Sequence, residues 1–282
     1  MRLVLAQDDG LNASACDRLM ARLASDQAAH DAEITIDLQA AAFIDPYGAA
    51  CLCLAARQLA ERQRRLVVVL PSHRRAQTMV IQTGLTNVLR QWAEVRNLPG
   101  PGSRDERSGA LPISPIRSRS DVQAVLAYLI NLAQQRLGFD QGDVLDASKV
   151  VSELCYNVVD HSQADGLAVA QISRDRQGQR YVSLAVADAG VGIRASLAAR
   201  HPEAAEWRHG EAIQRALGGL SSRTSGGGAG LRSIDAVVHR YGGRLAIRSG
   251  DERLYISADR QPLTLAGAWF PGTQVGISFS QR

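Results

Sequence analysis

Residues 147–161, A-S-K-V-V-S-E-L-C-Y-N-V-V-D-H, combine the apolar spacing of a buried helix with polar side chains that do not suit a core. The polar residues follow one another at spacings of four, three and one: Glu153, Asn157, Asp160 and His161. At about 100° per residue, Glu153 and Asn157 lie about 40° apart and Asp160 about 20° to the other side of Glu153, so they form one stripe. Polar groups on a buried helix need partners, because an unsatisfied one costs about 1–3 kcal/mol. A hydrated magnesium ion and a nucleotide phosphate would supply those partners, whereas a solvated stripe without function explains the pattern equally well.

Two glycine clusters follow this helix along the chain. The first, Asp188-Ala189-Gly190-Val191-Gly192, comes directly after the strand-like run 181–187. Such an Asp can accept a hydrogen bond from an exocyclic amine while the glycines let the backbone approach a flat base, although a plain turn explains this short motif equally well. The second, Gly226-Gly227-Gly228-Ala229-Gly230, opens a helix that begins at Leu231. Glycines before a helix N-terminus present N–H groups and the positive end of the helix dipole to a phosphate.

The order and spacing of these motifs resemble the N, G1 and G2 boxes of the GHKL superfamily, which includes sensor histidine kinases, gyrase, Hsp90 and the anti-sigma-factor serine kinases. An E-x-x-x-N-x-x-D-H helix, a strand ending in D-x-G-x-G, a variable loop and a G-G-G-x-G helix start occur in that order. The segment Pro271-Gly272-Thr273-Gln274-Val275 also looks like the last strand of the family, whose Thr lies near the adenine. The resemblance spans nearly all of residues 120–282 and implies a C-terminal α+β Bergerat sandwich that binds ATP with Mg²⁺.

The resemblance also implies roles for individual residues. Glu153 would be the general base that orients the attacking water or substrate hydroxyl, Asn157 the magnesium ligand, and Asp188 the partner of the adenine amine. The other residues that it assigns to the nucleotide site are His161, Gly190, Gly192, Gly226, Gly228, Gly230, Leu231 and Thr273, with Gly226, Gly228 and Gly230 forming the phosphate lid. Phosphoryl transfer needs mainly positioning and charge neutralisation, which a metal ion and backbone amides supply. The chain has no G-x-x-x-x-G-K-[S/T] sequence, which excludes a P-loop as the source of phosphate binding.

The N-terminal half alternates strand-like and helical runs, which predicts an open α/β sheet with helices packed on it. We expect strands at residues 2–7, 33–38 and 66–70 and helices at residues 12–28 and 46–63. The second helix has a clear start signal, because Asp45 can cap the free N–H groups while Pro46 occupies the first helical position.

Residues 34–57 of this half, I-T-I-D-L-Q-A-A-A-F-I-D-P-Y-G-A-A-C-L-C-L-A-A-R, resemble the STAS domain of anti-sigma-factor antagonists. In that family the strand-to-helix turn reads D-S-x-G or similar, and the Ser or Thr before the glycine is the phosphate acceptor. Here the turn is Asp45-Pro46-Tyr47-Gly48, with Tyr47 at the acceptor position. Because a tyrosine hydroxyl lies farther from the backbone than that of serine, we expect Tyr47 to pack or to recognise a partner at the helix start.

Chain length predicts two domains, and together with the alternating runs and the two resemblances it gives an expected α/β protein of two domains. With 282 residues, the chain is longer than a single domain of about 100–200 residues. We expect a STAS-like domain at residues 1–95, a linker rich in proline and glycine at 96–119, and the ATPase-like domain at 120–282.

Hydrophobic residues make up 45% and charged residues 21% of the chain, and no run approaches the roughly 18–20 apolar residues of a membrane helix, so we expect a cytoplasmic protein. The four cysteines form no C-x-x-C pair and are expected to be buried thiols: Cys16, Cys51, Cys53 and Cys155. The basic residues behind the net charge of +4 are scattered and only 5% of residues are aromatic, so no nucleic-acid partner is expected.

These observations leave two classes of function open. The first is a regulator that binds ATP and slowly transfers phosphate to Ser or Thr of a separate STAS-type or sigma-factor-like protein, or acts as a slow ATPase. In it, the STAS-like half would be a dock or an internal inhibitor. The second is a nucleotide-gated interaction module without chemistry. No long helix carries a phosphoacceptor histidine, so a complete sensor histidine kinase is not expected, and a homodimer stays open.

Overall fold

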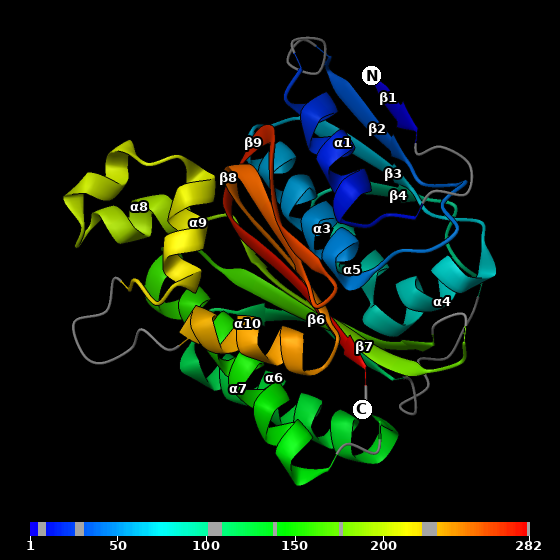
Figure 1. The fold of residues 1–282 in the computed structure, drawn as a ribbon. Helices are drawn as coiled ribbons and strands as arrows, with labels where there is room; N and C mark the ends of the chain where they lie inside the picture. Colours follow the sequence, from blue (N-terminus) through cyan, green and yellow to red (C-terminus); the bar gives the residue numbers. More distant parts are fainter. Residues whose placement is uncertain are drawn as a thin grey trace.

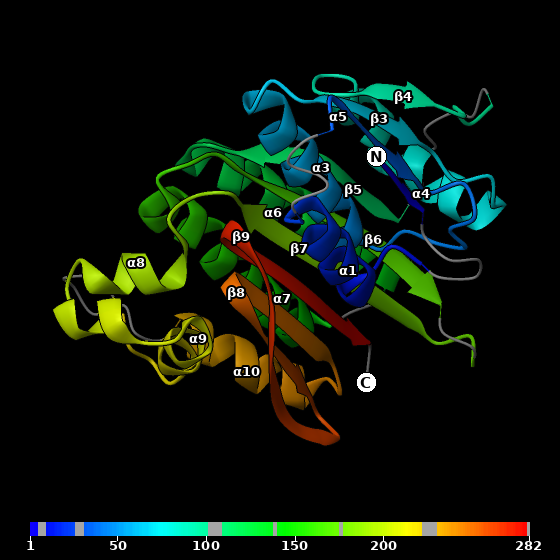
Figure 2. The same cartoon turned by 90° about the horizontal axis from the view of Figure 1, so that it is seen from above.

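Two β-sheets organise the molecule, which is shown in Figure 1. The computed structural model describes residues 1–4, 10–25, 31–100, 109–137, 140–174, 177–221 and 230–280. A four-stranded sheet comes from the N-terminal half of the chain and a five-stranded sheet from the C-terminal half. Helices lie between the two sheets and beyond the larger one (Figure 2).

The smaller sheet is parallel throughout, with the strand order β1-β2-β3-β4. Its strands are β1 (Arg2–Val4), β2 (Glu33–Asp37), β3 (Arg65–Val69) and β4 (Glu94–Arg96), and its helices are α1 (Ala13–Leu23), α3 (Pro46–Glu61), α4 (Arg74–Thr83) and α5 (Leu85–Leu89). Helix α3 begins where the sequence predicts, because Asp45 Oδ1 accepts a hydrogen bond of 2.6 Å from the Gly48 N–H and Pro46 fills the first position. This half is an α/β sheet with helices, as the alternating pattern indicates.

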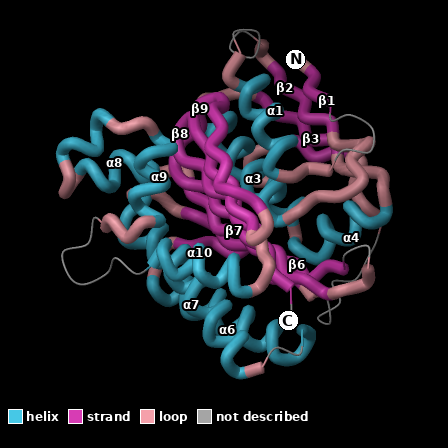
Figure 3. The backbone as a smooth tube through the Cα atoms, viewed as in Figure 1, coloured by secondary structure: helices cyan, strands magenta, loops and turns pink. Residues whose placement is uncertain are grey.

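The larger sheet is antiparallel, with the strand order β5-β6-β7-β9-β8. Its strands are β5 (Ala110–Ile116), β6 (Gly166–Arg174), β7 (Arg180–Asp188), β8 (Arg244–Ser257) and β9 (Arg260–Ser280). The helical elements are α6 (Arg119–Leu132), η1 (Ala133–Leu137), α7 (Gln141–Asn157), η2 (Val158–Ser162), α8 (Gly192–Ala198), η3 (Pro202–Glu206), α9 (His209–Leu217) and α10 (Gly230–Arg240). Helices α6, α7 and α10 pack on one face of this sheet, while α8 and α9 lie at one end of it (Figure 3).

Two strands differ from the expectation. Strand β5, at one edge of the larger sheet, lies inside the segment expected to be a linker. Its two prolines, Pro112 and Pro115, argue against a strand in the sequence, because proline has no N–H to donate. At the edge of a sheet a strand tolerates such residues. Strand β9 also begins well before the segment Pro271–Val275 that resembles the last strand of the family, because it forms a hairpin with β8 whose register shifts next to Gly250. Gly250 and Gly272 have φ of 65° and 77°, a conformation that glycine adopts without strain.

The two halves share one hydrophobic core. Helices α1 and α3 pack on the face of the larger sheet that is opposite to α6, α7 and α10 (Figure 2). Buried residues of the N-terminal half, such as Leu52 of α3, belong to the same apolar cluster as Val169 of β6 and Ala185 of β7. The N-terminal half therefore covers what would otherwise be an exposed apolar sheet face.

Buried ion pairs also join the halves. Asp17 of α1 accepts a hydrogen bond of 2.6 Å from Arg248 Nη1 and one of 3.3 Å from the Tyr255 hydroxyl, and it pairs with Arg253. Arg248 is only 2% exposed, so its buried positive charge needs the negative charge of the Asp17 carboxylate beside it. Strand β8 is thus held to α1 by charge as well as by apolar contact.

All four cysteines are buried and none forms a disulfide, in agreement with the expectation of buried thiols. Within the described residues, no helix combines the length and the apolar character that crossing a bilayer requires. The polar residues Glu153, Asn157 and Asp188 lie where the helical face of the larger sheet meets α8 and α9.

Candidate functional site

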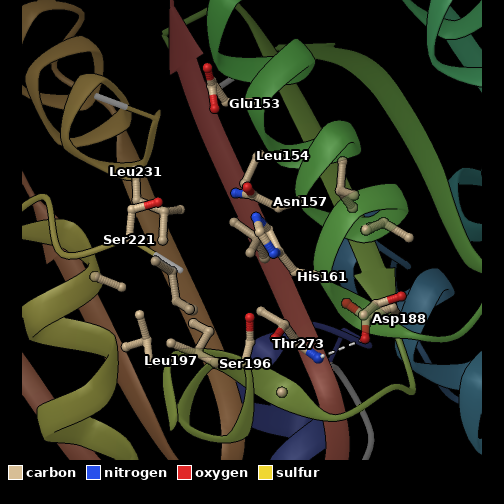
Figure 4. A pocket seen from close by; sticks show the side chains of 18 of the residues that line it. Glu153, Leu154, Asn157, His161, Asp188, Ser196, Leu197, Ser221, Leu231 and Thr273 are labelled. Atoms are coloured by element: carbon tan, nitrogen blue, oxygen red, sulfur yellow. Dashed lines mark hydrogen bonds between the residues drawn. The ribbon is translucent and has the colours of Figure 1, made fainter. Parts of the chain in front are cut away.

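A pocket opens between α7 and η2 on one side and α8 and α9 on the other, with β7, β8 and β9 as its floor. Its empty volume of about 860 Å³, part of it open to solvent, suits a small-molecule ligand. Figure 4 shows Glu153 and Asp188 towards opposite ends of this pocket, with Asn157 and His161 between them. Apolar side chains such as Leu154, Leu197 and Leu231 line the rest.

The polar stripe of the helix reaches the pocket, with one exception. Glu153 and Asn157 lie on α7, and His161 lies on η2, a π-helical turn that continues α7. A π turn advances each residue by less than the angle of an α-helix, which brings His161 round to the face of Asn157 and turns Asp160 away. Asp160 does not line the pocket and instead accepts a hydrogen bond of 3.1 Å from Arg119 Nη2. The placement of Asp160 in one stripe with Glu153 is therefore wrong, because the α-helical angle does not hold after Asn157.

Asp188 ends strand β7 and lies at the floor of the pocket, where it is 4% exposed. Its Oδ1 accepts hydrogen bonds from the N–H groups of Gly190, at 2.8 Å, and Thr273, at 3.3 Å. Burial raises the pKa of Asp188 to about 6, against the opposing effect of these two bonds and of the Arg57 charge. A largely ionised acceptor at neutral pH is well suited to bind an amine of a ligand.

The two glycines after Asp188, Gly190 and Gly192, are required for different structural reasons. A Cβ atom on Gly190 would lie 1.8 Å from the Ser162 carbonyl oxygen, so this glycine lets the turn pass the end of η2. Gly192 has φ of 78° and lines the pocket, whereas Gly190 does not. The sequence leaves two explanations open for these glycines, a close approach of the backbone to a base and a plain turn; for Gly190 the close neighbour is the chain itself.

The second glycine cluster is seen only at its end. Gly226 and Gly228 lie outside the described residues. Gly230 is the first residue of α10, and the next residue, Leu231, lines the pocket together with Thr273 of β9.

Several pocket residues have no signal in the sequence. Ser196 and Leu197 of α8, Ala216 of α9, Leu220 and Ser221 come from the stretch between the two glycine clusters, which lacks a distinctive motif. Ser249 of β8 lies behind them, where its hydroxyl accepts a hydrogen bond of 2.9 Å from the Ile193 N–H and donates one of 3.2 Å to the Gly272 carbonyl. Strand pairing brings these parts together, which local patterns do not reveal.

Tyr47, at the position of the STAS phosphate acceptor, lies at the interface of the two halves. It is 6% exposed, and a Cβ atom on Gly276 of β9 would lie 2.8 Å from its ring. Burial raises the pKa of its hydroxyl above the ordinary range. Of the two roles expected for Tyr47, the structure shows packing, and the surface it packs on is the back of the larger sheet.

Comparison with known protein families identifies the domain around the pocket. Residues 142–275 match the family described as histidine kinase-, DNA gyrase B-, and HSP90-like ATPase. This match includes α7, which carries Glu153 and Asn157, the turn at Asp188, and Thr273. A comparison of the chain with curated proteins gave no match. Residues 142–275 thus contain an ATPase domain of the GHKL type, a kind of domain that binds ATP, generally with Mg²⁺.

Proposed function

We propose that the pocket binds Mg-ATP and that the chain transfers the terminal phosphoryl group to a Ser or Thr of a separate protein, in a partner-switching pathway like that of anti-sigma factors. The observation that carries this proposal is the shared position of Glu153 and Asp188 in one pocket. A domain that only bound nucleotide would have less need of a carboxylate at the end away from Asp188. The family match supports the ATP-binding part of the proposal.

In this proposal three polar residues of the pocket have one task each. The Asp188 carboxylate accepts a hydrogen bond from the adenine amine at the buried end. Asn157, one turn after Glu153, offers an amide oxygen, a hard donor of the kind that Mg²⁺ takes in proteins. When bound, the metal ion neutralises charge on the phosphates. Glu153 orients the acceptor hydroxyl and takes its proton.

The phosphate acceptor in this proposal is a separate protein, because the N-terminal half is poorly placed to serve. Tyr47 is buried against β9, so its hydroxyl is closed to a second active site. Among the described residues, none that lines the pocket belongs to the N-terminal half, so this half does not inhibit by filling it. We propose a STAS-type or sigma-factor-like partner with an exposed hydroxyl, which docks outside the covered sheet face.

A second candidate is a nucleotide-gated interaction module without chemistry. It is favoured by the way α9, whose Ala216 lines the pocket, is tied to the hairpin of β8 and β9. Glu252 of β8 accepts a hydrogen bond of 2.6 Å from the Gly210 N–H at the start of α9, and His209 Nδ1 lies 2.5 Å from Asp251 Oδ1. A ligand that moves α9 would therefore act on the surface of the hairpin.

Incubation with ATP labelled on its terminal phosphate separates the two candidates. Wild type and Glu153→Ala are compared with Mg²⁺ present, with and without STAS-type proteins from the same cell, and binding of ATP is measured in parallel. A kinase labels a partner in a Glu153-dependent way, while Glu153→Ala still binds ATP. Binding by both proteins without label on any partner, and without release of phosphate, favours the module. Absence of ATP binding by the wild type contradicts both candidates.

A further inference from the structure

The side-chain amide of Gln274 bridges two strands at the buried end of the pocket. Its Nε2 donates a hydrogen bond of 2.9 Å to the Asp188 carbonyl at the end of β7 and one of 2.8 Å to the Pro271 carbonyl in β9. The backbone pairing of β7 with β9 ends at Ala187 and Gln274. Beyond that pair, this amide takes the place of the strand-to-strand hydrogen bonds.

The chemistry of its neighbours fixes the orientation of this amide. Both nearby groups are carbonyl oxygens, so the NH₂ group must face them, since a flipped amide would oppose oxygen to oxygen. Gln274 is fully buried, and its Oε1 has no hydrogen-bond partner within the described parts of the chain.

The donated bonds hold a turn that itself touches Asp188. A Cβ atom on Gly272 would lie 2.2 Å from the Asp188 carbonyl oxygen, so the turn 271–273 runs directly against the end of β7. In this position the Thr273 N–H reaches Asp188 Oδ1 at 3.3 Å. Without the amide, the buried Asp188 carbonyl and the partly buried Pro271 carbonyl would lose their donor, and the turn would lose its connection to β7 on that side.

We infer that Gln274 is a positioning residue for the nucleotide site: its amide holds the turn 271–273 on the end of β7, so that the Thr273 N–H holds the Asp188 carboxylate in place at the floor of the pocket. This inference rests on the proposed role of Asp188 in binding the adenine amine. Gln274 points to the back of the sheet, like Gly276 two residues on, which contacts Tyr47. The buried end of the pocket is therefore supported from the face that the N-terminal half covers.

The test is calorimetric titration of Mg-ATP and Mg-GTP into wild type and Gln274→Leu between pH 5 and pH 8. Losing the bonds that hold the turn is expected to weaken ATP binding at pH 7.5 about tenfold. It also shifts the pH midpoint of ATP binding upwards, because the Asp188 carboxylate loses a donor. The preference for ATP over GTP, which lacks the adenine amine, falls. Ser278→Ala, on the same strand and face, serves as the matched control and is expected to behave as wild type.

The pH readout must be assigned to Asp188 rather than to its charged neighbours. Those neighbours are Arg57 of α3, Asp165 before β6, and His161 and Glu153 on the helix above the pocket. The pKa of Asp188 is therefore also measured directly, by carbon NMR of the unliganded wild type and variant. It is expected to be higher in Gln274→Leu, a shift that a general loss of stability would not produce.

Gln274→Asn, which keeps the amide but is one methylene shorter, is the second variant and is used alone if Gln274→Leu does not fold. It is expected to change the same quantities in the same direction. An unchanged ATP affinity, pH midpoint and Asp188 pKa in a folded Gln274 variant overturns the inference and leaves the proposed function intact. A wild type that binds neither nucleotide overturns the proposed function itself.

Discussion

Two turns of this protein, one in each half, share an Asp side chain that accepts a hydrogen bond from a following glycine N–H, and they differ in their surroundings. Asp45, after the isolated bridge at Ile44, accepts a backbone hydrogen bond of 2.6 Å from Gly48, three residues on, and Asp188, at the end of β7, accepts one of 2.8 Å from Gly190, two residues on. In both, the protein around the carboxyl raises its pKa, to about 7 for Asp45 and about 6 for Asp188. Of the two, Asp188 lines the pocket between α7 and α8.

The difference between the two turns lies in what covers them. The turn at Asp45 is closed by the contact of Tyr47 with the back of the larger sheet, so its carboxylate serves to start α3. The turn at Asp188 is left open by α8 and α9, so its carboxylate can meet a ligand. An Asp and a glycine in a turn are therefore not enough for a binding site, which also needs an open pocket beside the carboxylate.

The largest expected effect tests what the two turns share. A Cβ atom on Gly190 would lie 1.8 Å from the Ser162 oxygen, and one on Gly48 would lie 2.1 Å from the Leu11 oxygen. Because both neighbours are backbone atoms, Gly190→Ala and Gly48→Ala are each expected to lower the free energy of unfolding by about 3 kcal/mol or more. Urea denaturation measures this.

Gly100→Ala is the control for these variants, because no atom lies within 4 Å of a Cβ atom there. It is expected to change the free energy of unfolding by less than about 0.5 kcal/mol. If Gly190→Ala were as stable as this control, the close approach of the turn to η2 would not be a constraint on the fold.

The next largest effect is the pH dependence of Asp188, which acts in opposite directions on the stability of the protein and on its affinity for ATP. The folded-state pKa of Asp188, about 6, is above its ordinary value of 3.8, so the folded protein holds this proton more tightly than the unfolded chain. The unliganded protein therefore gains stability from this group, on the order of 3 kcal/mol, as the pH falls from above 6 to below 4. ATP affinity is expected to fall over the same range, because the carboxylate that accepts the amine is lost.

Asp45 contributes to stability with the same sign, as the pH falls from above 7 to below 4, and is not expected to contribute to ATP binding. Urea denaturation and ATP titration at several pH values, on wild type, Asp188→Asn and Asp45→Asn, distinguish the two carboxyls. A fall of ATP affinity with pH that persists in Asp188→Asn would assign the effect to another group.

The smallest effect concerns the contribution of the N-terminal half to the pocket. Arg57 of α3 donates a hydrogen bond of 3.3 Å to the carbonyl of Asp165, next to Gly166, which pairs with Asp188 across β6 and β7. Its charge lowers the pKa of Asp188. Arg57→Gln is expected to raise the pH midpoint of ATP binding by less than about one unit, while Arg57→Lys restores it. Arg62→Gln, exposed after the same helix, is the control, and an equal shift there would mean that net charge alone is responsible.

The sequence predicted the parts of the molecule that depend on neighbours along the chain. The start of α3 at Asp45 and Pro46 and the position of Glu153 and Asn157 on one helical face follow from local geometry. The π turn that moves Asp160 away, the edge strand with Pro112 and Pro115, and the bonds of Gln274 do not. These features depend on contacts between residues that are far apart in sequence, and a periodic pattern of neighbouring residues does not predict such contacts.

The measurement that tests the account most directly is titration of Mg-ATP into wild type, Asp188→Asn and Asp45→Asn at pH 7.5. The two variants make the same change in the two similar turns, and Asn caps a helix about as well as Asp. We predict that Asp188→Asn binds ATP about 10–100-fold more weakly than wild type, because a hydrogen bond to a charged group is lost, and that Asp45→Asn binds as wild type does. Equal binding by wild type and Asp188→Asn would contradict the account.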